Sequence, residues 1–368
     1  MQRPKSIDRT LLGIVLILVG VGLFIFSSAS LGLLAREGAS FSSVALTQIV
    51  FGIIGGLAVM ALLSRVHYRI WRKYAFYIFL LGIGVSLLVF TPLGSEYGGA
   101  RRWIEIFGFS AQPSEFLKIA FVIYVATWFS GWKPGMDDFI HSTLPFLLSI
   151  LVVAIVMLLQ KDTDAFIIMA TAGAAIYFVQ CGKWKELVAG GVALILLVGA
   201  LAMYHDYLRI RLLSFANPGW DEQGAGYQIK QSLIAVGSGG AYGRGFGQSV
   251  QKFDYLPEPI GDSIFAVFAE EFGFVGTVFL ILLFSGFVFR GYRLATHAPD
   301  DFGMLVTVGF VTMIIFQAFL HMAATMQFAP ILGLPLPFIS HGGTAMMATL
   351  AMVGIILNIS RYRKKGVG

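Results

Sequence analysis

The residues of this sequence best suited to acid–base chemistry are four carboxylates in LPEPIGDSIFAVFAEEFGFVG, residues 256–276. Glu258 and Asp262 lie just before an apolar run, and Glu270 and Glu271 lie within it. Charged side chains at the mouth and in the body of a membrane helix are costly, so they usually mark a functional site. If a helix begins directly after Asp262, Glu270 lies about 12 Å further along it and is turned roughly 80° from Asp262. We therefore expect Asp262 and Glu270 to border one cavity, with Glu271 in a different contact.

Asp262 also has a simpler interpretation, as the N-cap of the helix that follows. Aspartate is common at this position because its carboxylate accepts a hydrogen bond from the first turn of the helix. Asn or Ser would serve as well, however, and capping explains neither Glu258 nor Glu270. The two interpretations stay open at this point.

Three adjacent residues at the edge of another apolar run, Arg101, Arg102 and Trp103, form a second polar group. A tryptophan ring and basic side chains are stable together at a membrane–water interface, so an interfacial anchor is one interpretation. Binding of an anionic ligand is the other.

A helix is predicted to start at Pro113, and it carries Glu115 and Lys118 in its first turns. Positions i and i+3 share a helix face, so the two side chains can pair. Pairing lowers the cost of a lysine inside a membrane helix. The pair either fixes helix packing or forms the polar floor of an outward-facing cavity.

A tight turn is predicted for QKDTDAF, residues 160–166, where Asp162 and Asp164 are expected to be solvated or to cap a helix. Lys161 would then offset their charge.

A short interfacial helix is predicted for residues 227–236. Ile229, Leu233 and Val236 would form its apolar side, and Lys230 would face water. The glycine-rich stretch 237–247 follows it without a preceding strand, so it is a weak phosphate-loop signal. We expect it to be a loop that closely approaches a bound ligand.

Irregular backbone is predicted for LGLPLPFISHGGTAM, residues 332–346, because Pro335 and Pro337 forbid a regular helix. Such backbone at membrane depth must be covered by protein or line a cavity. His341 is more typical of an interfacial histidine than of a ligand. No Cys/His metal spacing, nucleophile elbow, P-loop or haem motif occurs in the sequence.

The elements that position these residues are membrane helices. Of the 368 residues 57% are apolar and only 12% are charged, and the mean hydropathy is +0.80. Soluble domains average about 25% charged residues, so the sequence predicts an all-α polytopic membrane protein. The single cysteine, Cys181, excludes an intrachain disulfide.

Ten apolar runs are predicted to span the membrane: 11–34, 44–64, 75–93, 114–129, 144–159, 165–181, 187–204, 263–289, 302–325 and 342–359. The first is longer than the apolar core of a typical signal peptide, so we expect a retained anchor.

The basic residues predict the orientation of these ten helices, because cytoplasmic loops are enriched in Lys and Arg. With both termini on one side, that side holds 16 of the 26 basic residues. These are Arg3, Lys5, Arg9, Arg65, Arg69, Arg72, Lys73, Lys133, Lys183, Lys185, Arg290, Arg293, Arg361, Arg363, Lys364 and Lys365. Both termini are therefore expected in the cytoplasm, and the loop of about 205–262, between the seventh and eighth helices, is expected outside. The net charge of +6 reflects this topology and contact with anionic lipid, with no reason to invoke nucleic acid.

The motifs GARRW with QPSEFLK, GAGYQIKQSLIAVGSGG, LPEPIGDSIFAVFAEEFG and LPLPFISHGG occur here in that order. In this the sequence resembles the SEDS family of bacterial cell-wall polymerases over essentially its whole length. FSSAS and SRVHYRIWRK make it more similar to FtsW, the division member, than to RodA, the elongation member. Two departures stand out. QKDTDA replaces the usual Gln-Pro-Asp-x-Gly-Thr at residues 160–165, and His341 stands where Tyr is usual.

The resemblance implies one ten-helix membrane domain, 1–368, in the bacterial cytoplasmic membrane, which polymerises lipid II on the outer side. It places the family's essential acid on Asp262, and further motif positions on Trp103, Glu115, Lys118 and the segment with Glu258. It also implies a class B penicillin-binding protein as the transpeptidase partner.

The chemistry of this reaction suits the residues. Inversion at the anomeric carbon needs a base near the acceptor hydroxyl, for which Asp262 is the candidate. The pKa of Asp262 is expected to be raised by the membrane edge and by Glu258 or Glu270. Positive charge near the departing diphosphate could come from Arg101, Arg102 or Lys118, or from a divalent cation such as Mg²⁺ or Mn²⁺.

The main alternative is a transporter that flips a lipid-linked saccharide. It would share the cavity, the buried charges and the lipid substrate. Transporters tend to show internal repeats and broken helices near the bilayer midplane. Here the polar motifs gather on the predicted outer side, which favours an enzyme.

Overall fold

The computed structural model describes residues 6–35, 41–97, 99–106, 109–131, 143–204, 206–217, 219, 221, 224–253 and 255–364. Of the basic residues used to predict the orientation, Arg3, Lys5, Lys133 and Lys365 lie outside these ranges. Each of the ten predicted apolar runs coincides with a helix or with consecutive helices, apart from a few residues at the ends of some runs.

The first part of the chain forms α1 (Arg9–Ala29), η1 (Ser30–Ala35), α2 (Phe41–Leu46), η2 (Thr47–Gly55), α3 (Gly56–Leu63), α4 (Arg69–Leu87), η3 (Leu88–Phe90), β1 (Gly94–Tyr97), β2 (Ala100–Ile106), β3 (Phe109–Ala111), α5 (Pro113–Ser130) and α6 (Thr143–Leu159). The second part forms α7 (Thr163–Cys181), α8 (Trp184–Tyr204), α9 (Asp206–Ala216), α10 (Ala225–Ser238), α11 (Ile264–Thr296), α12 (Asp301–Thr325) and α13 (Gly343–Ser360).

Eight helical segments within the described ranges are long and apolar enough to cross a membrane, where the sequence predicts ten. They are Arg9–Gly32, Val44–Leu63, Arg69–Phe90, α7, α8, α11, α12 and α13. The other two predicted spans are present as helices. Of these, α6 has 17 residues, and α5 has 18 and carries Glu115 in its first turn.

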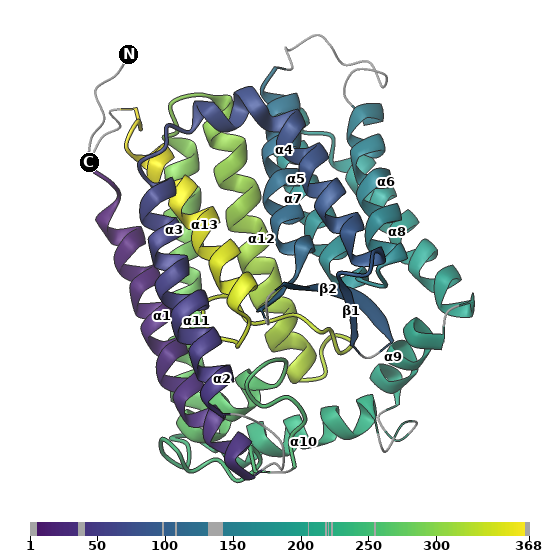
Figure 1. The fold of residues 1–368 in the computed structure, drawn as a ribbon, viewed down its shortest axis with the longest axis vertical. Helices are drawn as coiled ribbons and strands as arrows, with labels where there is room; N and C mark the ends of the chain where they lie inside the picture. The colour runs from purple at the N-terminus through teal and green to yellow at the C-terminus, as the bar shows by residue number, and fades with distance from the viewer. Residues whose placement is uncertain are drawn as a thin grey trace.

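The helices form a bundle around α12 and α13, the two most deeply buried spans (Figure 1). On one side α11 contacts α1 and α12, and α3 lies against α13. On the other side α5 and α7 contact α12, and α4 lies against α5. The first turn of α1 and the last turn of α13 lie at one end of the bundle, and the sheet and α10 lie at the opposite end.

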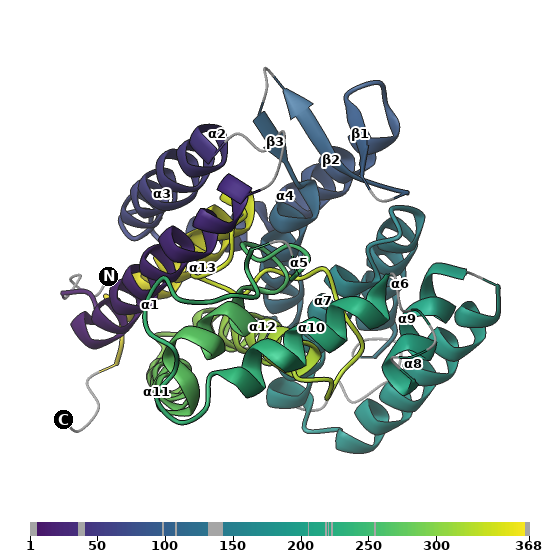
Figure 2. The same ribbon diagram turned by 90° about the horizontal axis from the view of Figure 1, so that it is seen from below.

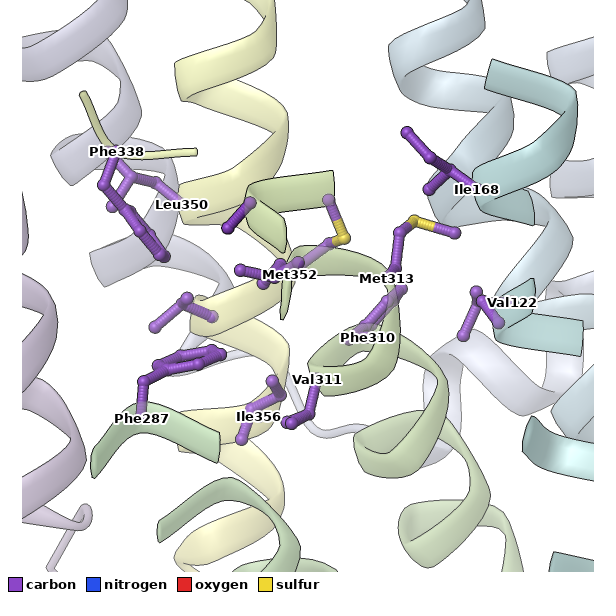
Figure 3. Packing of buried hydrophobic residues seen from close by; sticks show 14 of the residues in the cluster. Val122, Ile168, Phe287, Phe310, Val311, Met313, Phe338, Leu350, Met352 and Ile356 are labelled. Atoms are coloured by element: carbon purple, nitrogen blue, oxygen red, sulfur yellow. The ribbon is translucent and has the colours of Figure 1, made fainter. Parts of the chain in front are cut away.

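Side chains from several of these helices interdigitate in a dry apolar core (Figure 3). Phe310, Val311 and Met313 of α12 pack between Ile356 of α13 and Val122 of α5. All five are buried, with at most 2% of their surface exposed. In a close-packed interior these contacts fix the helix positions, and so fix the geometry at the end of the bundle that carries the polar motifs.

That end is closed by elements that the helical pattern only partly predicted (Figure 2). The sheet has the order β1–β2–β3, with antiparallel pairing at Gly94↔Ile104 and at Ile104↔Ala111. No strand was predicted there, because ARRW resembles an interfacial anchor more than an alternating strand. The helix predicted at 227–236 is confirmed as α10.

The face that α10 buries differs in one residue from the prediction. Ile229 is buried and Lys230 is exposed, as expected, but Leu233 is exposed. Ser232 and Ala235 lie on the buried face with Ile229. Residues three apart along a helix share a face, and here that face includes a serine, so hydrophobicity alone misplaced it.

The glycine-rich stretch after α10 packs on α11. The approach of this loop to a bound ligand stays a prediction. Helix α11 is interrupted at Gly273, whose φ of 63° and ψ of −161° are non-helical. The carbonyls of 240–241 accept hydrogen bonds from the N–H groups of 274–275, at 2.9 and 3.0 Å. The N–H groups of 244–245 donate to the carbonyls of 270–271, at 3.0 and 2.9 Å. The glycines thus allow the close backbone approach that satisfies the polar groups freed by the break in α11.

Candidate active site

Asp262 lies in the turn directly before α11, at the end of the bundle opposite the first turn of α1. The N-cap of α11 is Ser263, and no side chain caps the helix. The capping interpretation of Asp262 is therefore wrong. Within the part of the chain that the structure describes, no donor hydrogen-bonds the Asp262 carboxyl, and this half-buried group is available to a ligand.

Charged groups from α7 and α9 gather beside Asp262. A Cβ atom added at Gly333 would lie 3.6 Å from Oδ2 of Asp262 and 3.9 Å from both Nη2 of Arg211 and Oδ2 of Asp164. Nη1 of Arg211 donates to both carboxylate oxygens of Asp164, at 3.0 and 2.9 Å. The backbone N–H of Gly333 donates to Asp164 at 3.0 Å. The three charged groups therefore all lie against the backbone at Gly333.

The pKa of Asp262 is raised to about 7. Burial is the largest cause, and the negative charges of Glu258 and Asp164 add to it. Arg211 and Arg102 act in the opposite direction. This confirms the expected increase and the part that Glu258 plays in it. A carboxyl with a pKa near neutral is suited to proton transfer at physiological pH.

The irregular segment between α12 and α13 holds the turn at Asp262 in place. Oγ of Ser340 donates to the carbonyl of Gly261 at 2.9 Å, and the N–H of His341 donates to the carbonyl of Ile260 at 2.8 Å. The His341 ring stacks on Phe26, with ring centroids 5.9 Å apart. Burial lowers the pKa of His341, so the ring is neutral. Pro335 and Pro337 lie in this irregular segment, as predicted.

His321 of α12 shares a small cavity with Asp262, Gln228, Ser232 and Thr325. Its Nδ1 lies 2.7 Å from the carbonyl oxygen of Leu334, so Nδ1 carries the proton and Nε2 is left as an acceptor. Within the described ranges this buried Nε2 has no hydrogen-bond partner. The sequence analysis missed His321, although a histidine in an apolar run is a signal that could have found it.

The predicted anion-binding residues of β2 separate into two groups. Arg102 is close enough to Asp262 to lower its pKa, and it donates a hydrogen bond to the carbonyl of Lys161. Arg101 is exposed and pairs with Glu96 at 3.3 Å. Trp103 is half-buried opposite Ser95 of β1. Of these three, only Arg102 acts on Asp262.

The predicted pair of Glu115 and Lys118 is confirmed. Nζ of Lys118 lies 2.7 Å from Oε1 of Glu115, and both side chains are buried. Lys118 also donates to Gln317 of α12 at 3.2 Å, and Gln317 donates to the carbonyl of Pro335 at 2.8 Å. The pair therefore links α5, α12 and the irregular segment beside the site.

Asp162 and Asp164 in the turn at 160–166 are buried, not solvated, whereas Lys161 is exposed. Asp162 caps α7 by accepting a hydrogen bond from the N–H of Ala165, as predicted. Its other oxygen accepts bonds from Ser114 at 3.0 Å and Gln112 at 3.1 Å. The carboxylates at 162 and 164 can be buried because α5 and α9, from distant parts of the sequence, supply hydrogen-bond donors to them.

Glu270 does not line the cavity that contains Asp262, so the expectation that these two acids border one cavity is wrong. Its carboxylate accepts hydrogen bonds from Oγ of Ser249 at 2.6 Å and from the N–H of Val250 at 3.0 Å. Arg244 pairs with it at 3.5 Å. Glu271 serves a different contact, as expected, with Lys252. The contacts of Glu270 are those of an anchor for the loop at 249–252, and a role in substrate binding stays a prediction.

No three His, Cys, Asp or Glu side chains in the described ranges lie close enough together to hold a metal ion. The acids near Asp262 therefore do not form a ready site for the predicted divalent cation, and we derive no step through one.

The fold and the site together define a polytopic membrane protein with a partly buried acid–base site at one end of its helix bundle. The chain belongs to the FtsW/RodA/SpoVE family of cell cycle proteins, whose family model matches residues 9–365. Stage V sporulation protein E of Bacillus subtilis is 36% identical over 364 residues, which cover 98% of this chain and 99% of that protein. A protein of Geobacter sulfurreducens named "Probable peptidoglycan glycosyltransferase FtsW" is 37% identical over 318 residues, which cover 86% of this chain and 85% of that protein. A chain of a peptidoglycan synthase complex that coordinates polymerization and crosslinking matches with a TM-score of 0.81 and 27% identity, over 98% of this chain and 99% of that chain.

Proposed function

We propose that this protein is a peptidoglycan glycosyltransferase that polymerises lipid II into glycan strands. Family membership and the names of its relatives support the activity. The observation that carries the mechanism is Asp262. The other buried acids in the described structure are all paired or hydrogen-bonded. They are Asp8, Glu115, Asp162, Asp164, Glu270 and Glu271. Asp262 has no such partner and has a pKa near neutral.

In the proposed reaction Asp262 takes the proton of the acceptor sugar's 4-hydroxyl. The hydroxyl oxygen forms a bond to the anomeric carbon of the donor as the bond from that carbon to the lipid diphosphate breaks. A single displacement of this kind inverts the α-linked donor to a β-linked product. Arg102 and Arg211, whose charges act on Asp262, are the proposed cations for the departing diphosphate. The buried Lys118 is occupied by Glu115 and Gln317, which suits a supporting role.

Purified protein with lipid II is the direct test of this function. Formation of glycan polymer supports the proposal. Translocation of the lipid across a vesicle membrane without any polymer would replace it with the transporter interpretation.

Neutralising Glu258 is expected to shift the pH dependence of polymerisation to lower pH. Asp262 acts as a base only when deprotonated, so activity should rise as the pH passes about 7. The charge of Glu258 raises this pKa, so Glu258→Gln lowers the pH of half-maximal activity. The measurement is the rate of polymer formation between pH 5 and 9. Glu96→Gln, at an exposed acid in β1, should leave the profile in place, and an unchanged profile in Glu258→Gln would contradict the assignment.

The proposed topology has ten spans, a single membrane domain over 1–368, cytoplasmic termini and a site that faces outward. The ten helices that match the ten apolar runs and the uneven distribution of basic residues support it. In a Cys181→Ser background, Tyr242→Cys should react with a membrane-impermeant maleimide on intact cells. Arg72→Cys should react only after lysis, and the reverse result would invert the topology.

A class B penicillin-binding protein is the proposed partner. The matching structure comes from a complex that couples polymerization to crosslinking, and crosslinking is the reaction of a transpeptidase. The measurement is co-purification of the two proteins from membranes. If no complex is recovered in mild detergent, the pairing is contradicted.

A further inference from the structure

A basic pocket lies at the end of the bundle that holds the first turn of α1 and the last turn of α13, opposite the proposed active site. Its volume is about 680 Å³, and it lies between the first turns of α1 and the last turns of α3 and α13. Arg9, Arg65 and Arg361 line it, and none of the described lining residues is acidic. The pocket therefore has a strong preference for an anion.

The helix ends beside the pocket have their polar groups occupied. The carbonyl of Ser64 accepts hydrogen bonds from Asn358 at 2.8 Å and from Arg361 at 3.3 Å. Asp8 is bound by Arg290 and Arg363, so its carboxylate does not neutralise the pocket. Nε of Arg361 is buried and has no hydrogen-bond partner in the described structure.

Apart from Ser6 and Ser64, the remaining lining is apolar and includes Leu12, Met60 and Leu357. An arginine-rich rim over an apolar wall fits an amphiphile better than a free inorganic ion. Cavities of about 300–1,000 Å³ hold molecules much larger than a phosphate ion. We propose that this pocket binds the phosphodiester headgroup of an anionic membrane phospholipid, with its glycerol and upper acyl chains against the apolar wall. In the proposed topology it opens to the cytoplasmic leaflet, which is rich in such lipids.

Lipid titration followed by native mass spectrometry tests this proposal on the purified full-length protein. Phosphatidylglycerol should bind more tightly than phosphatidylethanolamine. Each arginine near an anionic headgroup is worth a factor of about 5, so Arg9→Gln with Arg65→Gln should weaken phosphatidylglycerol binding about 25-fold. This double variant keeps the bond from Arg361 to Ser64. Arg72→Gln is the matched control, because Arg72 is exposed in the first turn of α4 and does not line the pocket.

A second variant, Ala61→Phe, fills the pocket from its exposed rim and keeps all three arginines. This variant should also weaken phosphatidylglycerol binding. That result would show that the lipid occupies the pocket and is not held only by the positive charge of the surface. The proposal fails if the two lipids bind equally, if Arg72→Gln weakens binding as much as the double variant, or if Ala61→Phe has no effect. It also fails if inorganic phosphate displaces the lipid at equal concentration, since the pocket would then be a phosphate site.

Discussion

Asp262→Asn is expected to lower polymerisation of lipid II by about 10²–10⁴-fold, the usual contribution of a general base. Asparagine has nearly the same shape but cannot take the proton of the acceptor hydroxyl. The measurement is the amount of glycan polymer formed with time by purified protein in the presence of lipid II. Asp301→Asn is the matched control, because this exposed acid lies at the opposite end of α12 from the site.

The same variant is expected to keep its fold, and to unfold at a higher temperature than wild type at pH 8. The pKa of Asp262 is raised in the folded protein, from 3.8 to about 7. The ionised carboxyl therefore opposes folding, and the stability that belongs to its neutral form is lost as the pH rises through about 7. Asparagine carries no charge and avoids this loss. Near-normal polymerisation by a stably folded Asp262→Asn protein would refute the assignment of the base.

The sequence located Asp262 because a carboxylate beside an apolar run is conspicuous along the chain. Its neighbours could not be found in that way. Arg211, Asp164 and Gly333 come from α9, α7 and the irregular segment, and only the packing of the helices brings them together. The sequence spacing did predict the ion pair between Glu115 and Lys118, because the contact of an i, i+3 pair depends on one helix alone.

Glu270 shows that the free-energy cost of burying a carboxylate does not by itself identify a catalytic or binding residue. A buried carboxylate in a membrane helix predicts function, but it can also be stabilised by a loop that returns to the helix. The N–H groups and the hydroxyl of 249–251 supply that stabilisation here. The break at Gly273 and the glycine-rich stretch allow the loop to reach α11. None of these contacts is local in sequence, so the helical pattern gave no sign of them.

Lys252→Met is expected to cause the largest loss of stability among single substitutions outside the active site. Nζ of Lys252 lies 2.9 Å from Oε1 of Glu271, and both side chains are fully buried. Lys252 also donates to Ser28 of α1 at 2.9 Å and to the carbonyl of Gly247 at 2.8 Å. Removing the lysine leaves the Glu271 charge buried and uncompensated, at a cost of about 3–5 kcal/mol. The measurement is the free energy of unfolding in detergent, with the exposed Lys230→Met of α10 as the matched control.

A double substitution separates the charge from the packing. Glu271→Gln keeps an oxygen for the bonds from Ser28 and from the N–H of Ser249, but it removes the negative charge. Lys252→Met with Glu271→Gln should therefore be more stable than Lys252→Met alone, because no unpaired charge remains. If the double variant is as unstable as the sum of the two single variants, the pair contributes through packing and not through charge.

The loop that carries Lys252 joins α10 to the turn that carries Asp262. Lys252→Met should therefore lose polymerisation only at the temperature where the protein unfolds. A catalytic defect, in contrast, would lower polymerisation at every temperature.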